Sequence, residues 1–391
     1  MLTSVAIIFL LGLLLGEIFK KIGLPALLGM IITGIIISPH ALDLLDPSIL
    51  AISADLRLLA LIIILTRAGL SLDIHDLKRV GRPALLMCFL PASFEIIGII
   101  LIAPKVMGMT IVEAAILGSV IAAVSPAVVI PRMIKIMAKG YGKENSIPQL
   151  IMAGASVDDV FVIVLFTSFM SLALGGRVGL GNLLQIPVGI LLGILAGIIL
   201  GIGLVIFFRR FQLRDITSII VILSFSFLLI ELENKLEGII AISGLIGIMT
   251  IGLILSQRNK PLADNLSIKY NKLWIGAEIL LFVLVGSTVD LNYAIQAGLA
   301  SIIIVLFALI LRMVGVYVAL LGTDLPAREK LFCMIAYTPK ATVQAAIGAI
   351  PLSMGLACGH QVVTVAVLSI LITAPLGAMG IDYFYKKLLE K

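Results

Sequence analysis

The sequence predicts an all-α polytopic membrane protein with about thirteen transmembrane helices, an inverted repeat and two crossing broken helices. Three observations support this fold class. Of the 391 residues, 61% are hydrophobic and 13% are charged, and the mean hydropathy is +1.23, which is far outside the range of soluble domains. Apolar runs of spanning length follow one another along the chain, and two short patterns recur seven runs apart. We therefore expect no separate soluble domain.

A spanning helix needs about 20 apolar residues, and this criterion divides the chain into thirteen segments. The segments are expected to start near Leu2, Pro25, Leu56, Pro83, Ile111, Ile147, Pro187, Ile216, Gly238, Leu273, Ala294, Lys330 and Gln361. The first run has no basic stretch before it and no small-residue cleavage site, and Lys20 and Lys21 follow it. We therefore expect it to be a retained helix and not a signal peptide.

Lysine and arginine gather in alternate loops, and cytoplasmic loops are the ones that collect them. If the amino terminus lies outside, only Lys105, Arg177 and Lys235 fall in outer loops. This bias predicts an odd number of spans and a cytoplasmic carboxyl terminus. The net charge of +6 is then a signal of topology, and we do not expect nucleic-acid binding.

Two pairs of patterns indicate the repeat. Residues 123–126 read Ala-Val-Ser-Pro and residues 336–339 read Ala-Tyr-Thr-Pro, while residues 69–73 and 286–290 both read Gly-x-x-x-Asp. The members of each pair lie seven segments apart, and an odd offset places the second copy upside down, as in membrane proteins with inverted repeats. The seventh segment, residues 183–210, would then connect the two copies.

Proline interrupts a helix because it lacks an N–H and clashes with the preceding turn. Pro126 and Pro339 are therefore expected to break two helices at similar depth. Freed backbone groups are tolerated inside a membrane only where protein or a water-filled cavity satisfies them. Two breaks that meet are expected to mark a binding site for a transported solute.

Asp158 and Asp159 are adjacent carboxylates in an otherwise apolar run over residues 147–174. A charged side chain near the bilayer centre costs at least about 2.5 kcal/mol, so the pair indicates an ion or proton site. Neighbouring helix positions point about 100° apart. One carboxylate can therefore be tied to a base while the other faces a cavity.

Four further polar side chains are expected at the depth of the two aspartates. Counted at about 1.5 Å per residue, Ser125, Lys340, Glu95 and Arg312 lie roughly 13 to 18 Å from the predicted cytoplasmic surface. The layer then holds three acids and two bases, so ion pairing offsets part of the desolvation cost. The three cysteines show no metal-ligand spacing, and we expect no cofactor.

Six stretches of the chain are recognisable: LTRAGL at 65–70, VSPAVV at 124–129, GYG at 140–142, SVDD at 156–159, PKATVQAAIG at 339–348 and LSILITAP at 368–375. They resemble the sodium/proton antiporters of the cation:proton antiporter superfamily, and in particular the animal sodium(lithium)/proton exchanger subgroup and its bacterial relatives. The resemblance implies a homodimer, in a prokaryotic plasma membrane, with a scaffold domain and a mobile core. The scaffold would hold residues 1–80 and 211–292, which are helices 1–3 and 8–10, and the core would hold residues 81–175 and 293–391, which are helices 4–6 and 11–13.

The resemblance also implies roles for single residues. Asp159 resembles the acid that alternately binds the cation and protons, with Asp158 beside it. Ser125 and nearby carbonyl groups would complete a site for sodium or lithium. Lys340 resembles the lysine of the second broken helix.

Two arrangements of the ion pairs stay open. In the first, Glu95 pairs with Arg312, as the resemblance implies, and Asp158 pairs with Lys340. In the second, Arg312 neutralises Asp158. Arg312 stands where typical electrogenic members carry lysine, so the stoichiometry of exchange also stays open.

The implied function is secondary active antiport of sodium or lithium against protons by alternating access, with the cation and protons competing for one carboxylate. Its partners would be these ions and the lipid bilayer, and no enzymatic activity is expected. The alternatives are a potassium/proton antiporter and a sodium-coupled organic-anion symporter. An intramembrane aspartyl protease is a remote alternative, because its two carboxylates must converge from separate helices to share a proton.

Overall fold

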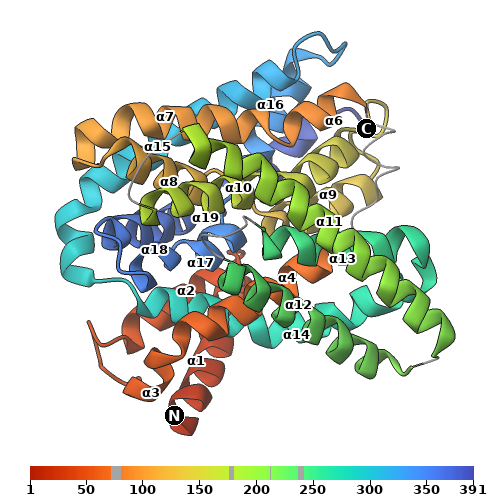
Figure 1. The fold of residues 1–391 in the computed structure, drawn as a ribbon. Coiled ribbons are helices and arrows are strands. Elements are labelled where there is room, and N and C mark those ends of the chain that lie inside the picture. Colours follow the sequence, from red (N-terminus) through yellow and green to blue (C-terminus); the bar gives the residue numbers. More distant parts are fainter. Residues whose placement is uncertain (72–80, 176–179, 212, 237–241) are drawn as a thin grey trace. The chain divides into compact units, whose positions relative to one another are not determined.

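The computed structural model describes residues 1–71, 81–175, 180–211, 213–236 and 242–391, and within these ranges it contains helices and no strand (Figure 1). Eight of the helices described are long and apolar enough to cross a membrane. Shorter apolar helices cover Ala26–Ile37, Gly244–Arg258 and Thr342–Ser353. The predicted all-α polytopic fold is confirmed, and the count of thirteen spans stays a prediction. Asp73, Arg177 and Gly238, which entered the sequence argument, lie outside the described residues.

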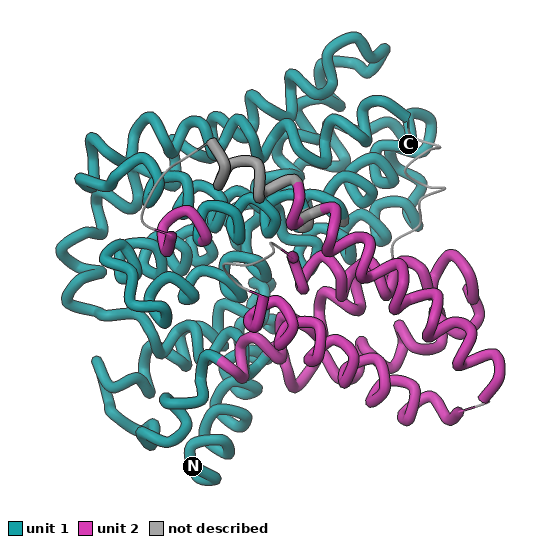
Figure 2. Tube along the Cα trace, viewed as in Figure 1, with its two compact units in different colours: residues 1–54, 75–170, 279–391 teal, residues 55–74, 171–278 magenta. Residues whose placement is uncertain are grey.

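The chain forms two compact units, each assembled from separate stretches of sequence (Figure 2). Unit 1 holds residues 1–54, 75–170 and 279–391, and unit 2 holds residues 55–74 and 171–278. The predicted scaffold and core are defined by which helices move relative to which. Compactness in one conformation does not measure that motion, so the division into scaffold and core stays a prediction.

Unit 1 contains both predicted interruptions and all the residues predicted to form the site. Its complete helices are α1 (Leu2–Lys21), α2 (Ala26–Ile37), α3 (Pro47–Ala51), α6 (Arg82–Met87), α7 (Leu90–Met107), α8 (Ile111–Ile121), α9 (Pro126–Ala138), α15 (Leu291–Ala319), α16 (Ala327–Ala336), α17 (Thr342–Ile347), α18 (Ile350–Ser353) and α19 (Gly359–Leu388). Most of α10 (Ile147–Leu174) also belongs to it. Helix α7 packs along α15 and against α8, and α19 packs against α15 and α16.

Unit 2 contains α11 (Leu180–Arg210), α12 (Asp215–Leu236) and α13 (Gly244–Arg258), with most of α4 (Ser53–Ser71) and the first part of α14 (Lys260–Ser287). Helix α11 packs along α13. A Cβ atom at Gly197 would lie 2.5 Å from the carbonyl oxygen of Gly247. The absence of a side chain at this position lets the two backbones approach closely.

The start of α14 shows where the hydropathy criterion was wrong. The predicted start was Leu273, whereas α14 begins at Lys260. Lysines and other polar residues lower the hydropathy of the first three turns. Those turns are helical because Ala263, Leu266 and Tyr270 recur at helical spacing and are all fully buried.

The two predicted interruptions lie between α8 and α9 and between α16 and α17. Pro126 is the first residue of α9, where its missing N–H has no intrahelical partner to lose. Pro339 lies within the second interruption, over residues 337–341. Its carbonyl oxygen accepts a hydrogen bond of 2.7 Å from the backbone N–H of Ser125. The two interruptions are therefore in direct contact.

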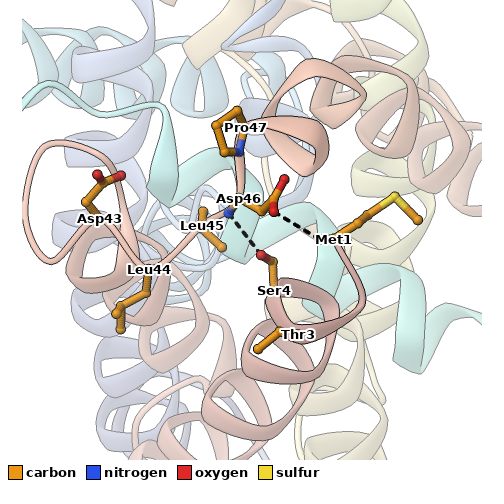
Figure 3. A pocket seen from close by; sticks show the side chains of 8 residues that line it. All are labelled: Met1, Thr3, Ser4, Asp43, Leu44, Leu45, Asp46 and Pro47. Carbon is orange, nitrogen blue, oxygen red and sulfur yellow. Dashed lines mark hydrogen bonds and ion pairs between the residues drawn. The ribbon is translucent and has the colours of Figure 1, made fainter.

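A shallow pocket lies beside the start of α1 and holds none of the predicted site residues (Figure 3). Asp46 lines it and caps α3, accepting hydrogen bonds from the backbone N–H of Ser48 at 2.8 Å and from its hydroxyl at 2.6 Å. The carboxylate also pairs with the amino group of Met1 at 3.2 Å. The hydrogen bonds from Ser48, above all, lower the pKa of Asp46 from 3.8 to about 2.

Candidate ion-binding site

Four charged side chains are buried together in unit 1, and each is fully shielded from solvent: Glu95, Asp158, Arg312 and Lys340. They come from α7, α10, α15 and the second interruption. We call these four residues the buried charge network. These four members of the layer predicted by counting along the helices therefore contact one another.

Arg312 joins the two acids of the network. Its Nη2 atom lies 2.8 Å from Oδ2 of Asp158, and its Nη1 atom lies 3.1 Å from Oε2 of Glu95. The planar guanidinium presents five donors in a fixed fork, which suits such a bridge. The remaining donors reach the two interruptions, because Nε donates to the Tyr337 carbonyl oxygen at 2.7 Å and Nη1 donates to that of Ala122.

Lys340 pairs with Glu95 and not with Asp158. Its Nζ atom lies 2.7 Å from Oε1 of Glu95 and donates to the Ile121 carbonyl oxygen at 2.5 Å. The predicted pairing of Lys340 with Asp158 is wrong, because Arg312 already binds that carboxylate. The Arg312–Glu95 pair of the first arrangement and the Arg312–Asp158 pair of the second occur together.

Asp159 stands apart from this network. The network contains two acids and two bases, so its formal charges cancel without Asp159. Asp158 is fully buried, while Asp159 keeps part of its surface exposed. The Oδ1 atom of Asp159 is buried and has no hydrogen-bond partner among the described residues. The two adjacent carboxylates therefore differ as the 100° spacing predicts, with one tied to a base and the other not.

The first interruption lies against Asp158. Oδ2 of Asp158 accepts a hydrogen bond of 2.8 Å from the backbone N–H of Val124. The next residue, Ser125, precedes α9 and is 1% exposed, and its Oγ atom has no hydrogen-bond partner in the described part of the chain. Oδ1 of Asp158 is likewise buried and without a partner there. This region therefore offers carboxylate and hydroxyl oxygens to which none of the described residues donates a hydrogen bond.

The carbonyl groups at the end of α8 are capped by side chains from the other repeat. A helix leaves its last carbonyls without intrahelical donors. Lys340 donates to the Ile121 oxygen, Arg312 donates to the Ala122 oxygen, and Gln344 donates from Nε2 to the Ala123 oxygen at 2.8 Å and to the Ile121 oxygen at 3.3 Å. The sequence reasoning gave Gln344 no role. The sequence feature that could have identified Gln344 is that it is an uncharged polar residue in an apolar stretch, one helical turn after Lys340.

Tyr337 and Gly154 are two further residues that the sequence reasoning missed. The Tyr337 ring lies 5.4 Å from Cζ of Arg312, within cation–π range. A Cβ atom at Gly154, one turn before Asp158, would collide with the Tyr337 hydroxyl. Glycine at 154 therefore makes room for the tyrosine that packs on Arg312.

Residues 5–387 match the profile of the family described as sodium/hydrogen exchanger, transmembrane. The chain belongs to this family. Human sodium/hydrogen exchanger 9B2 is 30% identical to this exchanger over an alignment of 387 positions, gaps included, that covers 94% of the chain and 70% of the relative. Human sodium/hydrogen exchanger 9B1 is 30% identical over an alignment of 406 positions, gaps included, that covers 98% of the chain and 78% of the relative.

The fold of the exchanger matches a solved structure. The sodium proton antiporter MjNhaP1 from Methanocaldococcus jannaschii at pH 8 superposes with a TM-score of 0.86, at 20% identity, covering 98% of this chain and 97% of the other. At that identity the match shows the fold alone. Together with the family match and the apolar helices, it makes the chain an integral membrane protein of a transporter family, and a protease is not favoured.

Proposed function

We propose that this exchanger moves sodium against protons by alternating access, and that Asp159 is the carboxylate for which the cation and protons compete. One observation carries the assignment to Asp159. The neutral network of Glu95, Asp158, Arg312 and Lys340 does not include it, and the part of the chain that the structure describes shows no ion pair at Asp159. A carboxylate without a fixed partner can hold a proton or a cation in turn.

Buried oxygens at the first interruption and on Asp158 support a cation site. Asp158 Oδ1 and Ser125 Oγ have no partners among the described residues, and the contact of Val124 with Asp158 brings the two elements together at 2.8 Å. Carboxylate and hydroxyl oxygens suit hard cations, whereas soft metals prefer sulfur ligands. Lithium would bind the same oxygens, and potassium is the alternative that a flux assay separates.

The stoichiometry follows from what holds Asp158. Its Oδ2 atom binds both Arg312 and the Val124 N–H, so exchanging a proton there would break two interactions. We therefore assign one proton per sodium ion, carried at Asp159. Exchange in proteoliposomes should then run at the same rate when valinomycin and potassium clamp the membrane potential at zero or at a negative value. A rate that follows the potential contradicts this assignment.

The moving parts are proposed from the repeat. Residues 81–175 and 293–391 would move as the core against a dimeric scaffold of residues 1–80 and 211–292, with residues 183–210 connecting them. The arrangement of lysine and arginine in the loops supports an outer amino terminus and a cytoplasmic carboxyl terminus, in a prokaryotic plasma membrane. Cysteine crosslinking of the dimer and labelling of the two termini in intact cells test these assignments.

Proteoliposome flux tests the role of Asp159. We expect a sodium pulse to drive proton movement through the wild-type protein and none through Asp159→Asn, because an amide cannot cycle a proton. Asp382→Asn is the matched control, since Asp382 has a side chain that is 52% exposed and pairs with Arg132. Near wild-type flux through Asp159→Asn would contradict the assignment.

Competition at one site also fixes the pH dependence. If one proton competes with sodium, apparent sodium affinity improves tenfold for each pH unit until the site is deprotonated and then levels off. Sodium titrations at half-unit pH steps measure this slope. An affinity that stays constant with pH would exclude a shared site.

A further inference from the structure

We propose that Gln344 is a positioning residue of the ion site: it caps the end of α8 with neutral donors and so holds residues 124 and 125 in place throughout the exchange cycle. The proposal rests on the proposed function, because it concerns the same site. Gln344 is fully buried. Its role comes from the two carbonyl groups that it binds.

The end of α8 depends on three donors of two kinds. Lys340 and Arg312 are charged, and each also binds an acid of the network. Gln344 is neutral, and its Nε2 atom reaches the carbonyl oxygens of Ile121 and Ala123 at 3.3 and 2.8 Å. The amide therefore spans the last helical residue and the first part of the interruption.

The difference in charge matters when ions move. A cation entering near Asp159, or a proton leaving it, changes the field on Lys340 and Arg312, and charges interact strongly where water is excluded. An uncharged amide experiences a much smaller force. Gln344 can therefore keep the Ile121 and Ala123 carbonyls bound while the charged donors adjust.

The capped carbonyls lead directly to the site. After Ala123, the Val124 N–H binds Asp158 at 2.8 Å, and the Ser125 N–H binds the Pro339 carbonyl at 2.7 Å. Without Gln344, the Ala123 carbonyl would lose the donor that the described structure gives it. The backbone that presents the Ser125 hydroxyl would then be less well fixed.

The test compares two glutamines of the same kind. Gln344→Leu removes both hydrogen bonds at the interruption. Gln361→Leu is the matched control, because Nε2 of Gln361 in α19 also donates to a carbonyl, that of Met107 at 3.1 Å, without touching the interruptions. Both variants should lose some thermal stability in detergent, since each leaves a carbonyl without its donor.

Sodium-driven proton flux in proteoliposomes then separates positioning from general stability. We expect the apparent sodium KM of Gln344→Leu to rise on the order of tenfold, the lower end of the effect of removing a group that supports a ligand indirectly. The KM of Gln361→Leu should match that of the wild type. A wild-type KM in Gln344→Leu would overturn the inference while leaving the proposed function intact, whereas absence of flux in the wild-type protein would overturn both.

Gln344→Glu keeps the side chain's size and tests the inference even if the leucine variant does not fold. A protonated glutamic acid can still donate to one carbonyl, but an ionised one cannot. We expect the ratio of its sodium KM to that of the wild type to increase from pH 6 to pH 9. A ratio that does not change with pH would overturn the inference.

Discussion

Each of the two interruptions separates two helices, but their polar groups differ. The first, between α8 and α9, presents mainly backbone acceptors: the carbonyls of Ile121, Ala122 and Ala123 all receive side-chain donors. The second, between α16 and α17, supplies donors to it, because Lys340 lies in that interruption and Gln344 lies in the helix that follows. The side-chain donors that bind the carbonyls of the first interruption therefore all come from the second half of the repeat.

This contrast indicates what an inverted repeat preserves. Both copies keep a break near a proline, yet Pro126 begins a helix whereas Pro339 lies inside its interruption. The geometry of two open backbone segments in contact is retained, while the side chains have diverged. The charges that neutralise one segment can therefore come from the other.

The largest effect is expected at the residue that joins both interruptions. Arg312→Ala leaves two buried acids without their shared partner, and loss of one member of a buried pair typically costs about 3 to 5 kcal/mol. Thermal unfolding in detergent measures this. Arg132→Ala is the control, since its partner Asp382 is half exposed and such pairs contribute about 0 to 1 kcal/mol.

Double-mutant cycles sharpen that prediction. Glu95→Ala alone should also lower stability, and combining it with Arg312→Ala should recover part of the loss. The recovery is limited because Asp158 and Lys340 stay in place without Arg312. We expect Arg312 to couple both to Glu95 and to Asp158, and coupling to only one acid would contradict the bridge.

A smaller effect is expected where the second interruption meets α10. Gly154→Ala would push a methyl group against the Tyr337 hydroxyl and to 2.9 Å from Cβ of Met87, and overpacking of this kind costs about 1 to 3 kcal/mol. Tyr337→Phe removes the obstructing hydroxyl, which has no partner among the described residues, so the double variant should recover part of the stability.

Gly203→Ala is the matched control for that experiment. Gly203 lies within α11, and a Cβ atom there would meet nothing within 4 Å. Alanine is a better helix former than glycine by about 0.5 to 1 kcal/mol, so this variant should be as stable as the wild type or more stable. Equal losses for Gly154→Ala and Gly203→Ala would show that steric conflict at Tyr337 is not the cause.

Two hydroxyl groups should respond in opposite ways: that of Ser125 in the first interruption and that of Thr373, which lies in α19 and binds the second interruption. Ser125 Oγ is buried and has no partner in the described structure, so Ser125→Ala removes no hydrogen bond and should not lower stability, but it should raise the sodium KM. Thr373 Oγ1 accepts from the backbone N–H of Lys340 at 3.0 Å, so Thr373→Val should cost about 1 to 3 kcal/mol by leaving that N–H unpaired. A large loss of stability in Ser125→Ala would contradict the contrast.

The smallest effect is expected away from both interruptions, at Asp46. Because hydrogen bonds from Ser48 lower the pKa of Asp46 to about 2, the carboxylate contributes its stabilisation fully above its unfolded pKa of 3.8 and loses it as the pH falls towards 2. The difference in melting temperature between Asp46→Asn and the wild type should therefore be constant between pH 5 and pH 6, where the amino group of Met1 that pairs with Asp46 keeps its charge. A difference that changes across that range would show another titrating partner.

The sequence predicted which charged residues would lie together, but not which base would bind which acid. Counting along helices brought Glu95, Asp158, Arg312 and Lys340 to one layer, and the structure places them in contact. It did not predict which base binds which acid, because depth does not fix how helices are arranged around one another. The contact between Gly154 and Tyr337 was not predicted for the same reason, because it depends on which helices lie side by side.

The sequence also did not predict which side chains bind the carbonyl groups freed at the interruptions. The prolines predicted where the helices would be interrupted, because proline acts locally on its own helix. The donors for the freed carbonyls come from residues about two hundred positions away, such as Gln344 for Ala123 at a separation of 221 residues. Sequence pattern alone contains no information on such pairs until the fold is known.

The buried charge network also sets an order of events during synthesis. Asp158 precedes Arg312 by 154 residues, so at about 5 to 20 residues per second the acid leaves the ribosome about 8 to 30 s before its partner. Glu95, 217 residues ahead of Arg312, waits longer. Until its partner is made, each of these two acids costs about 2.5 to 3.5 kcal/mol as a charged side chain at the centre of a membrane helix. The first half of the repeat therefore lacks the bases that neutralise its acids in the folded structure. Completion of unit 1 therefore depends on the arrival of the last third of the chain.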